Sequence, residues 1–224
     1  IPENNNIHNM SANRLNYDLN SLSLGVTQLR TNENHSLTSG PPVDINHNIR
    51  GTYLSWAGNF ADIFLEYADK ISTSKISNFG GIPNDTLKRG YGYYQNVNIY
   101  FGNWGLSTEY KRYSFDRLYG DITANEYGNQ IEYQQMPTLA KEHNSTLLGR
   151  VSHTYSFNDE RGIQFELNGS IMDLAISMQY AHLSRNEKWR SNSENDWTHS
   201  IIDNYLPSSD FSALPYWENY NEIS

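Results

Sequence analysis

Residues 90–115 contain the pattern that most restricts the fold, because apolar and polar side chains alternate along two arms that meet at a turn. On the first arm Ile99 and Phe101 fall on one face of an extended chain, and the residues between them fall on the other. Alternation with a period of two is typical of a β-strand with one buried face. Gly102 and Asn103 readily adopt the positive φ angles of tight hairpin turns. The segment is therefore predicted to be a β-hairpin.

Aromatic side chains gather at the ends of these two arms. They are Tyr91, Tyr93, Tyr94, Trp104, Tyr110 and Tyr113. Tyrosine and tryptophan combine an apolar ring with a polar edge, which suits a position between an apolar and a wet environment. The hairpin is accordingly interpreted as one unit of a membrane-spanning β-sheet.

Other segments repeat the pattern. Residues 14–30 change the phase of their apolar positions across residues 20–21, which predicts a second tight turn. Residues 49–67 predict a third hairpin, with its turn at residues 57–59. The turn at Gly102 should then lie on the same side of the sheet as these two.

One arm of the third hairpin is irregular. Leu54 and Trp56 lie out of phase with Ile49 and Tyr53, so the sequence does not decide which face of this strand is apolar.

The pattern is weaker after residue 143. A strand is predicted over residues 144–155, followed by a turn at residues 158–162. A well-alternating strand over residues 162–168 should reverse at residues 168–170 into a last strand over residues 172–180. The Asn-Gly-Ser sequence at this second reversal is a typical turn composition.

Long polar segments separate the hairpins, at approximately residues 31–48, 70–89 and 116–142. Loops beyond about 12–15 residues are uncommon in compact soluble domains. Transmembrane barrels instead combine short turns on one side with long loops on the other and strands of about ten residues. The sequence therefore predicts an all-β fold, an antiparallel up-and-down transmembrane β-barrel of about eight to ten strands.

Two regions are expected. Residues 1–184 would hold the barrel strands and loops, and residues 185–224 would form a long loop or an unpaired tail, because alternation is lost there and Pro207 and Pro215 interrupt it. No initiator methionine or signal segment precedes Ile1, so we expect an incomplete barrel from a longer protein.

Composition excludes several classes of protein. The net charge of −9 leaves no basic face for nucleic acid. An aromatic content of 13% argues against a disordered chain. The absence of cysteine excludes disulfides and thiolate chemistry. No run of 18 apolar residues is present, which excludes a transmembrane helix.

The faces opposite the apolar ones carry charged residues of both signs. In a barrel they would line the lumen. The candidate lumen-facing residues are Arg14, Asp18, Asp62, Glu66, Glu109, Lys111, Arg150, Glu166 and Asp173. This surface would be slightly acidic, and an open pore built from it would mildly favour cations.

A secreted soluble β-sandwich is the alternative, because its strands alternate in the same way and its charged faces would simply be solvated. Such a protein would bind glycans through aromatic platforms built from Trp104, Trp189, Trp197 and Trp217. The alternation of short turns with long loops favours the barrel over this alternative.

Three segments resemble a known class of protein: LSLGVTQLR, PTLAKEHNSTLLGR and NDERGIQFELNGSIMDLAISMQYAHLS. They are similar to outer-membrane β-barrel proteins of uncharacterised function from Gram-negative bacteria, over residues 13–184. The resemblance implies a barrel in the cell outer membrane, where lipid is the main partner. It implies no substrate.

No catalytic constellation is evident. The seven histidines are scattered without metal-ligand spacing, and no serine lies in a nucleophile-elbow motif. We therefore expect no enzyme activity, cofactor or metal, although an outer-membrane hydrolase is a minor alternative. The expected role is porin-like, transport-related or structural, with small solutes or glycans as candidate ligands.

Overall fold

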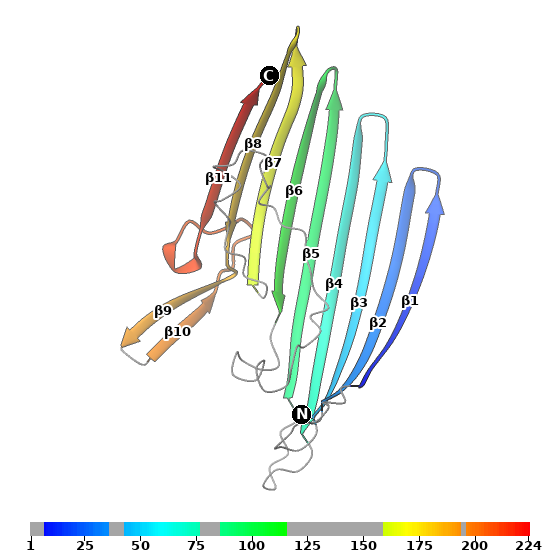
Figure 1. The fold of residues 1–224 in the computed structure, drawn as a ribbon, viewed down its shortest axis with the longest axis vertical. Coiled ribbons are helices and arrows are strands. Elements are labelled where there is room, and N and C mark those ends of the chain that lie inside the picture. The colour runs from blue at the N-terminus through cyan, green and yellow to red at the C-terminus, as the bar shows by residue number, and fades with distance from the viewer. Residues whose placement is uncertain (1–6, 36–42, 77–85, 116–158, 194–195) are drawn as a thin grey trace, which may run out of the picture.

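The structure is a computed structural model, and it describes residues 7–35, 43–76, 86–115, 159–193 and 196–224. Most of them form a nine-stranded sheet in the order β1-β2-β3-β4-β5-β6-β7-β8-β11 (Figure 1). The strands are β1 (Ile7–Leu19), β2 (Leu22–His35), β3 (Val43–Ala57), β4 (Ala61–Ile76), β5 (Thr86–Phe101), β6 (Trp104–Phe115), β7 (Asp159–Ile171), β8 (Leu174–Ser184) and β11 (Tyr216–Ile223). All neighbouring strands are antiparallel, which confirms the predicted all-β, up-and-down arrangement.

The short turns lie together at one end of the sheet (Figure 1). The turns near residues 20, 58 and 103 are where the sequence predicted them, and they share one side, as expected. In three of the four short turns of the nine-stranded sheet the first turn residue has a positive φ: 48° for Asn20, 57° for Gly102 and 55° for Met172. Asparagine and glycine tolerate this conformation well, whereas methionine does not.

Two of the predicted turns are wrong. Residues 159–162 belong to β7 and pair with β6. Residues 168–170 also remain in β7, and the chain reverses at Met172 and Asp173 instead. The physical reason is visible at Gly169, which sits under the ring of Trp104 on β6, so the glycine serves a close approach between strands.

The strands extend further than the apolar pattern predicted. Strands β2 and β3 continue through much of the predicted loop over residues 31–48, and β4 and β5 shorten the one over residues 70–89. Amide side chains tie the extensions together: Asn32 Nδ2 donates to Asn46 Oδ1 at 2.8 Å, and Asn34 Nδ2 donates to Asp44 Oδ1 at 2.6 Å. The strand predicted over residues 144–155 lies outside the described residues.

The structure differs from the loop or unpaired tail predicted for residues 185–224. Strands β9 (Glu187–Ser193) and β10 (Asp196–Ile201) form a two-stranded sheet, and the 3-10 turn η2 (Phe211–Ala213) precedes β11, which pairs with β8. The sequence pattern missed β11 because neither of its faces is consistently apolar, and its pairing relies on the backbone ladder. Within the described part of the chain, no helix is long and apolar enough to span a bilayer.

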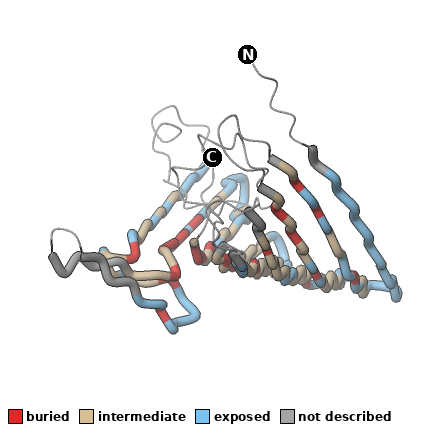
Figure 2. The backbone as a smooth tube through the Cα atoms, turned by 90° about the horizontal axis from the view of Figure 1, so that it is seen from below, coloured by how far each residue is buried: buried red, intermediate tan, exposed pale blue. Residues whose placement is uncertain are grey.

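The sheet is curved and open. Viewed along the strands, its two ends bend toward the same side, which leaves β1 and β11 apart (Figure 2). It is thus an incomplete barrel, as expected. Apart from the small β9–β10 sheet, the described residues form no second sheet, so the two packed sheets of the β-sandwich alternative are not found in this region. The buried core is correspondingly small, with Ala181 and Leu183 packed against Tyr216.

Candidate functional site

The register assigns every strand residue to one of two faces, because cross-strand partners point to the same side. We call the convex face the one that carries Leu15, its partner Val26 on β2, and Phe165 on β7. The concave face carries the strand residues that alternate with these, such as Arg14 on β1 and Glu109 on β6. The two faces differ sharply in composition.

Large apolar side chains cover the convex face on the side of the short turns, across all nine strands. We call this surface the apolar band. It contains Leu15, Tyr17, Leu19, Leu22, Leu24, Val26, Leu54, Trp56, Ile63, Leu65, Tyr67, Val97, Ile99, Phe101, Trp104, Leu106, Ile163, Phe165, Leu167, Ile171, Leu174, Ile176, Met178, Tyr180, Trp217 and Ile223.

Many of these side chains are exposed. The exposed fraction is 71% for Leu15, 53% for Leu174 and 68% for Ile223. Within the described strands, no Asp, Glu, Lys or Arg lies between members of the band on this face. The band is weakest on β11, where Asn219 and Asn221 separate its two apolar members. From Ile163 to Ile171 it spans about 27 Å along β7, at about 3.4 Å per residue.

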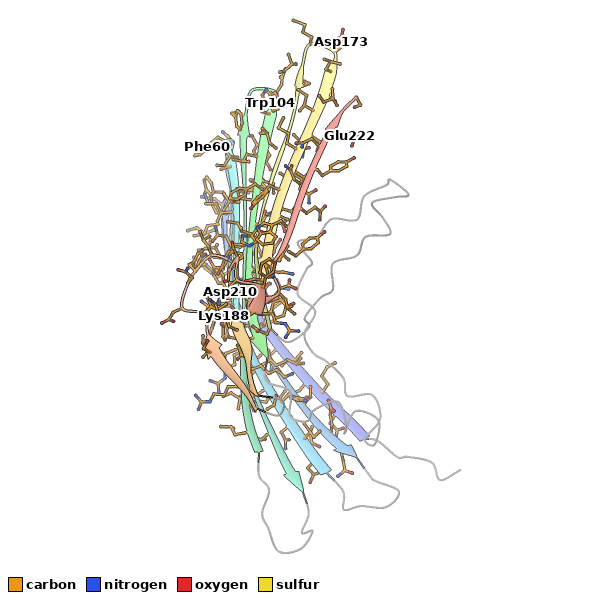
Figure 3. All side chains as sticks on the ribbon, turned by 90° about the vertical axis from the view of Figure 1, so that its left-hand side faces the viewer. Phe60, Trp104, Asp173, Lys188, Asp210 and Glu222 are labelled. Atoms are coloured by element: carbon orange, nitrogen blue, oxygen red, sulfur yellow. The ribbon has the colours of Figure 1, made fainter. Side chains whose placement is uncertain are left out.

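Aromatic residues mark both borders of the band. Near the short turns Phe60 lies on the convex side and meets Trp56 edge-on, with ring centroids 6.0 Å apart (Figure 3). On the far border Tyr67 is followed, on the same face, by Asp69 of β4.

Charge resumes beyond that border on other strands as well. The corresponding residues are Arg50 on β3, Arg112 on β6 and Arg161 on β7. The convex face therefore passes from apolar, through aromatic, to charged along the strands.

The concave face gathers most of the predicted lumen-facing residues. Those on it are Arg14, Asp18, Asp62, Glu66, Glu109, Lys111 and Glu166. Two predicted residues are not among them. Asp173 lies in the β7–β8 turn, at the tip of the hairpin (Figure 3), because the reversal falls later than predicted. Arg150 lies outside the described residues.

Hydrogen bonds link the concave face into local groups. Tyr100 Oη donates to Asp62 Oδ2 at 2.6 Å. Arg14 Nη2 donates to Tyr53 Oη at 3.0 Å. The first bond joins the neighbouring strands β4 and β5, and the second reaches from β1 across β2 to β3.

A second set of bonds lies nearer the middle of the sheet. Asn98 Nδ2 donates to Asn96 Oδ1 at 2.8 Å, and Asn168 Nδ2 donates to Glu166 Oε1 at 2.8 Å. Further from the short turns, Lys111 Nζ forms a buried ion pair with Glu160 Oε1 at 2.6 Å.

The sequence pattern missed part of this surface. Glu218 and Glu222 of β11 also lie on the concave face, where Tyr216 and Tyr220 donate to them at 3.1 and 2.9 Å. They were missed because β11 was not predicted as a strand. The alternation of Glu with Tyr from residue 216 onward was the available indication.

Carboxylates are spread over the concave face, although Glu109 and Glu166 lie close enough on the adjacent strands β6 and β7 to interact electrostatically. Asp62 and Glu166 share one row of the sheet but stand three strands apart, which is about 14 Å at about 4.8 Å per strand. This is further than the separation of carboxylate pairs that act on one bond. Among the described residues, no group of three or more His, Cys, Asp or Glu could hold a metal ion.

The tryptophans proposed for glycan binding do not form a common platform. Trp104 covers Gly169, and Trp217 stacks on His182 with ring centroids 5.0 Å apart. Both belong to the apolar band, on widely separated strands. The side chains of Trp189 and Trp197 are not among those described.

Over residues 5–203 the chain matches a family described as a family of unknown function, DUF6029. No curated protein and no solved structure matches it.

Proposed function

We propose that this chain, which belongs to the DUF6029 family, is part of an outer-membrane β-barrel protein. Its apolar band contacts lipid, and its concave face lines the barrel interior. The role is porin-like, transport-related or structural. The observation that carries the proposal is the uncharged, exposed apolar band that crosses all nine strands on one face while the other face is polar.

The energetics of exposure support a lipid environment. Fully burying one Leu, Ile or Phe side chain is favourable by about 1.5–3 kcal/mol, so exposing a whole band to water is costly. Soluble monomers rarely expose contiguous apolar patches larger than a few hundred Å². A hydrocarbon environment removes this cost, and the band length of about 27 Å along β7 is comparable to the roughly 25 Å apolar belt of transmembrane barrels.

Backbone hydrogen bonding favours a closed barrel over an open sheet in that environment. A sheet in a bilayer must pair every backbone N–H and C=O, which requires closure. Outer membranes of Gram-negative bacteria are the usual location of such barrels. Additional strands between β1 and β11 would complete the ring.

The concave face suggests the type of solute. Its carboxylates include Asp62, Glu109, Glu166 and Glu222, which outnumber the basic Arg14 and Lys111 near them. An interior of this charge attracts cations and repels anions.

Two measurements on the full-length protein test the proposal. The protein should fold only in detergent or lipid and should migrate differently on electrophoresis before and after heating. A monomer that stays folded without detergent would contradict the membrane location. Reconstitution in planar bilayers should give cation-preferring conductance steps, and their absence from a heat-modifiable protein would leave the structural role.

A further inference from the structure

The residues between β10 and β11 lie against the convex face at the charged border of the apolar band. We call residues 202–215 the crossover segment. Tyr205 stacks on Tyr110 of β6 with ring centroids 4.2 Å apart and an interplanar angle of 9°, and its carbonyl accepts from Tyr110 Oη at 2.9 Å. The ring contact fixes the segment on the outer side of the sheet.

Arg161 of β7 provides a second attachment. Its guanidinium is fully buried and donates to the carbonyls of Ile202 and Asn204 in the segment, at 2.8 Å for Ile202, and to that of Asn186 at 3.2 Å. A buried guanidinium with carbonyl partners is a strong, directional anchor. The segment is therefore held in place by the sheet.

The 3-10 turn η2 within the segment is also fixed. Asp210 accepts from the backbone N of Ser212 at 3.0 Å and from Lys188 Nζ of β9 at 2.8 Å (Figure 3). Leu214 ends the turn with φ 48°, and its N–H donates to Phe211 O at 3.0 Å. Leucine in the left-handed region costs about 1–2 kcal/mol, so the turn is maintained by its surroundings.

This ordered turn presents apolar side chains to the exterior. Phe211 is 86% exposed and Leu214 is 58% exposed, while Ala213 between them is buried. Leu214 is separated by only two residues from Trp217, where the apolar band begins on β11. The exposed apolar side chains of η2 thus lie close in sequence to the point where the band begins on β11.

We propose that η2 is an interfacial anchor that inserts Phe211 and Leu214 into the bilayer surface beside the apolar band. This inference rests on the proposed membrane location. It places the crossover segment at the membrane surface, at the end of the sheet opposite the short turns. An exposed aromatic and an aliphatic residue on one turn are typical of segments that lie in the headgroup and acyl-chain boundary.

The charges at the turn indicate which lipid headgroup the insertion of η2 requires. Lys188 and Asp210 form an ion pair, and the two inserting side chains are uncharged. Insertion therefore depends on apolar burial and requires no anionic headgroup. Zwitterionic phosphatidylcholine vesicles are an adequate probe.

Site-specific fluorescence tests the anchor. Because the chain has no cysteine, Phe211→Cys and Leu214→Cys each introduce a single thiol for a polarity-sensitive dye in the full chain. Met178→Cys in the apolar band and Asp173→Cys at the short turn are the lipid-facing and water-facing controls. In phosphatidylcholine vesicles, labels at residues 211 and 214 should emit at shorter wavelength than the label at residue 173 and should lose intensity when the acyl chains are brominated.

The controls separate the two proposals. If the label at residue 178 is quenched and those at residues 211 and 214 behave like the one at residue 173, the anchor is refuted and the membrane location stands. If the label at residue 178 is itself unquenched, the proposed membrane location fails. A blue-shifted label at residue 211 that brominated lipid does not quench would place protein over the turn, such as a second copy, and would also refute the anchor.

Discussion

Close packing between glycine and an aromatic ring shapes the sheet at the level of single residues. The ring of Trp104 occupies the space that a side chain at Gly169 would need, and Tyr53 covers Gly25 in the same way on the concave face. Glycines of this kind allow strands to bend and let rings lie flat on the sheet.

A substitution at Gly169 should therefore be costly. Gly169→Ala would force the Trp104 ring to move, and overpacking of this kind typically destabilises by about 1–3 kcal/mol. Gly105→Ala is the matched control, since its Cβ would approach nothing closer than a Tyr100 carbon at 3.9 Å. Urea unfolding in detergent micelles should show a lower midpoint for Gly169→Ala only. Equal midpoints for the two variants would show that the Trp104 ring moves aside without a cost in stability.

Titration of Asp210 provides a second residue-level prediction. The Lys188 ammonium, followed by hydrogen bonds from Ser212, lowers the pKa of the Asp210 carboxyl well below its ordinary value. Since this pKa is depressed in the folded state, its contribution to stability is present above the unfolded value of about 3.9 and is lost as the pH falls through the folded value.

Carbon-13 NMR titration of Asp210 should therefore give a pKa below the ordinary range. Lys188→Met should move it upward by removing the largest cause. Asp210→Asn should abolish the pH dependence of the turn. An unchanged pKa in Lys188→Met would show that the ion pair contributes nothing in solution.

The turn positions show which features of the fold can be predicted from residue types. The Gly102 turn was predictable because glycine and asparagine favour positive φ and the alternation changes there as well. The turn at Met172 was not predictable, because methionine has no preference for turns. Gly169, three residues earlier, is a typical turn residue and suggested a reversal there instead. The shared face of the seven predicted lumen-facing residues on the concave side could be read from the alternation of the sequence alone, whereas Glu218 and Glu222 required the pairing of β11 with β8.

At the level of strands, the two faces should respond differently to charge. Met178 and Ser177 are neighbours on β8 that face opposite sides, and Ser177 pairs with Glu222 on the concave face. Met178→Arg should cost about 2–4 kcal/mol if it faces the middle of a bilayer. Ser177→Arg should be tolerated because carboxylates lie nearby.

Urea unfolding of both variants in phosphatidylcholine vesicles measures this difference. A midpoint lowered in Met178→Arg but not in Ser177→Arg is expected. Equal effects on both variants would contradict a lipid-facing convex side.

Strand β3 explains why alternation alone was ambiguous. Leu54 and Trp56 face the convex side, while Ile49 and Tyr53 face the concave side, so apolar residues occur on both. Ile49 also lies at a different height along the strand: Leu54 and Trp56 are within the band, whereas Ile49 lies beyond its border, beside Arg50. The predicted polar loops likewise became strand because side-chain pairs such as Asn32 with Asn46 link the two strands.

At the level of the whole molecule, the up-and-down order was predictable because each short turn joins strands that pair. What the sequence could not indicate was the return of the chain to β8 after the β9–β10 hairpin and the path of residues 202–215 over the convex face. These depend on contacts between distant residues, such as Arg161 with the carbonyl of Ile202. A local pattern contains no information about such contacts.

The lengths of the connections also bear on the order in which the sheet assembles. Few residues separate the paired strands from β1 to β6, whereas residues 116–158 separate β6 from its partner β7. Each doubling of a connecting loop adds about 0.6 kcal/mol of closure entropy, and pairings between distant segments slow folding. The β7–β8 hairpin should therefore pair with β6 only after the first six strands have paired with one another, so that a chain arrested before this step would expose the β6 edge.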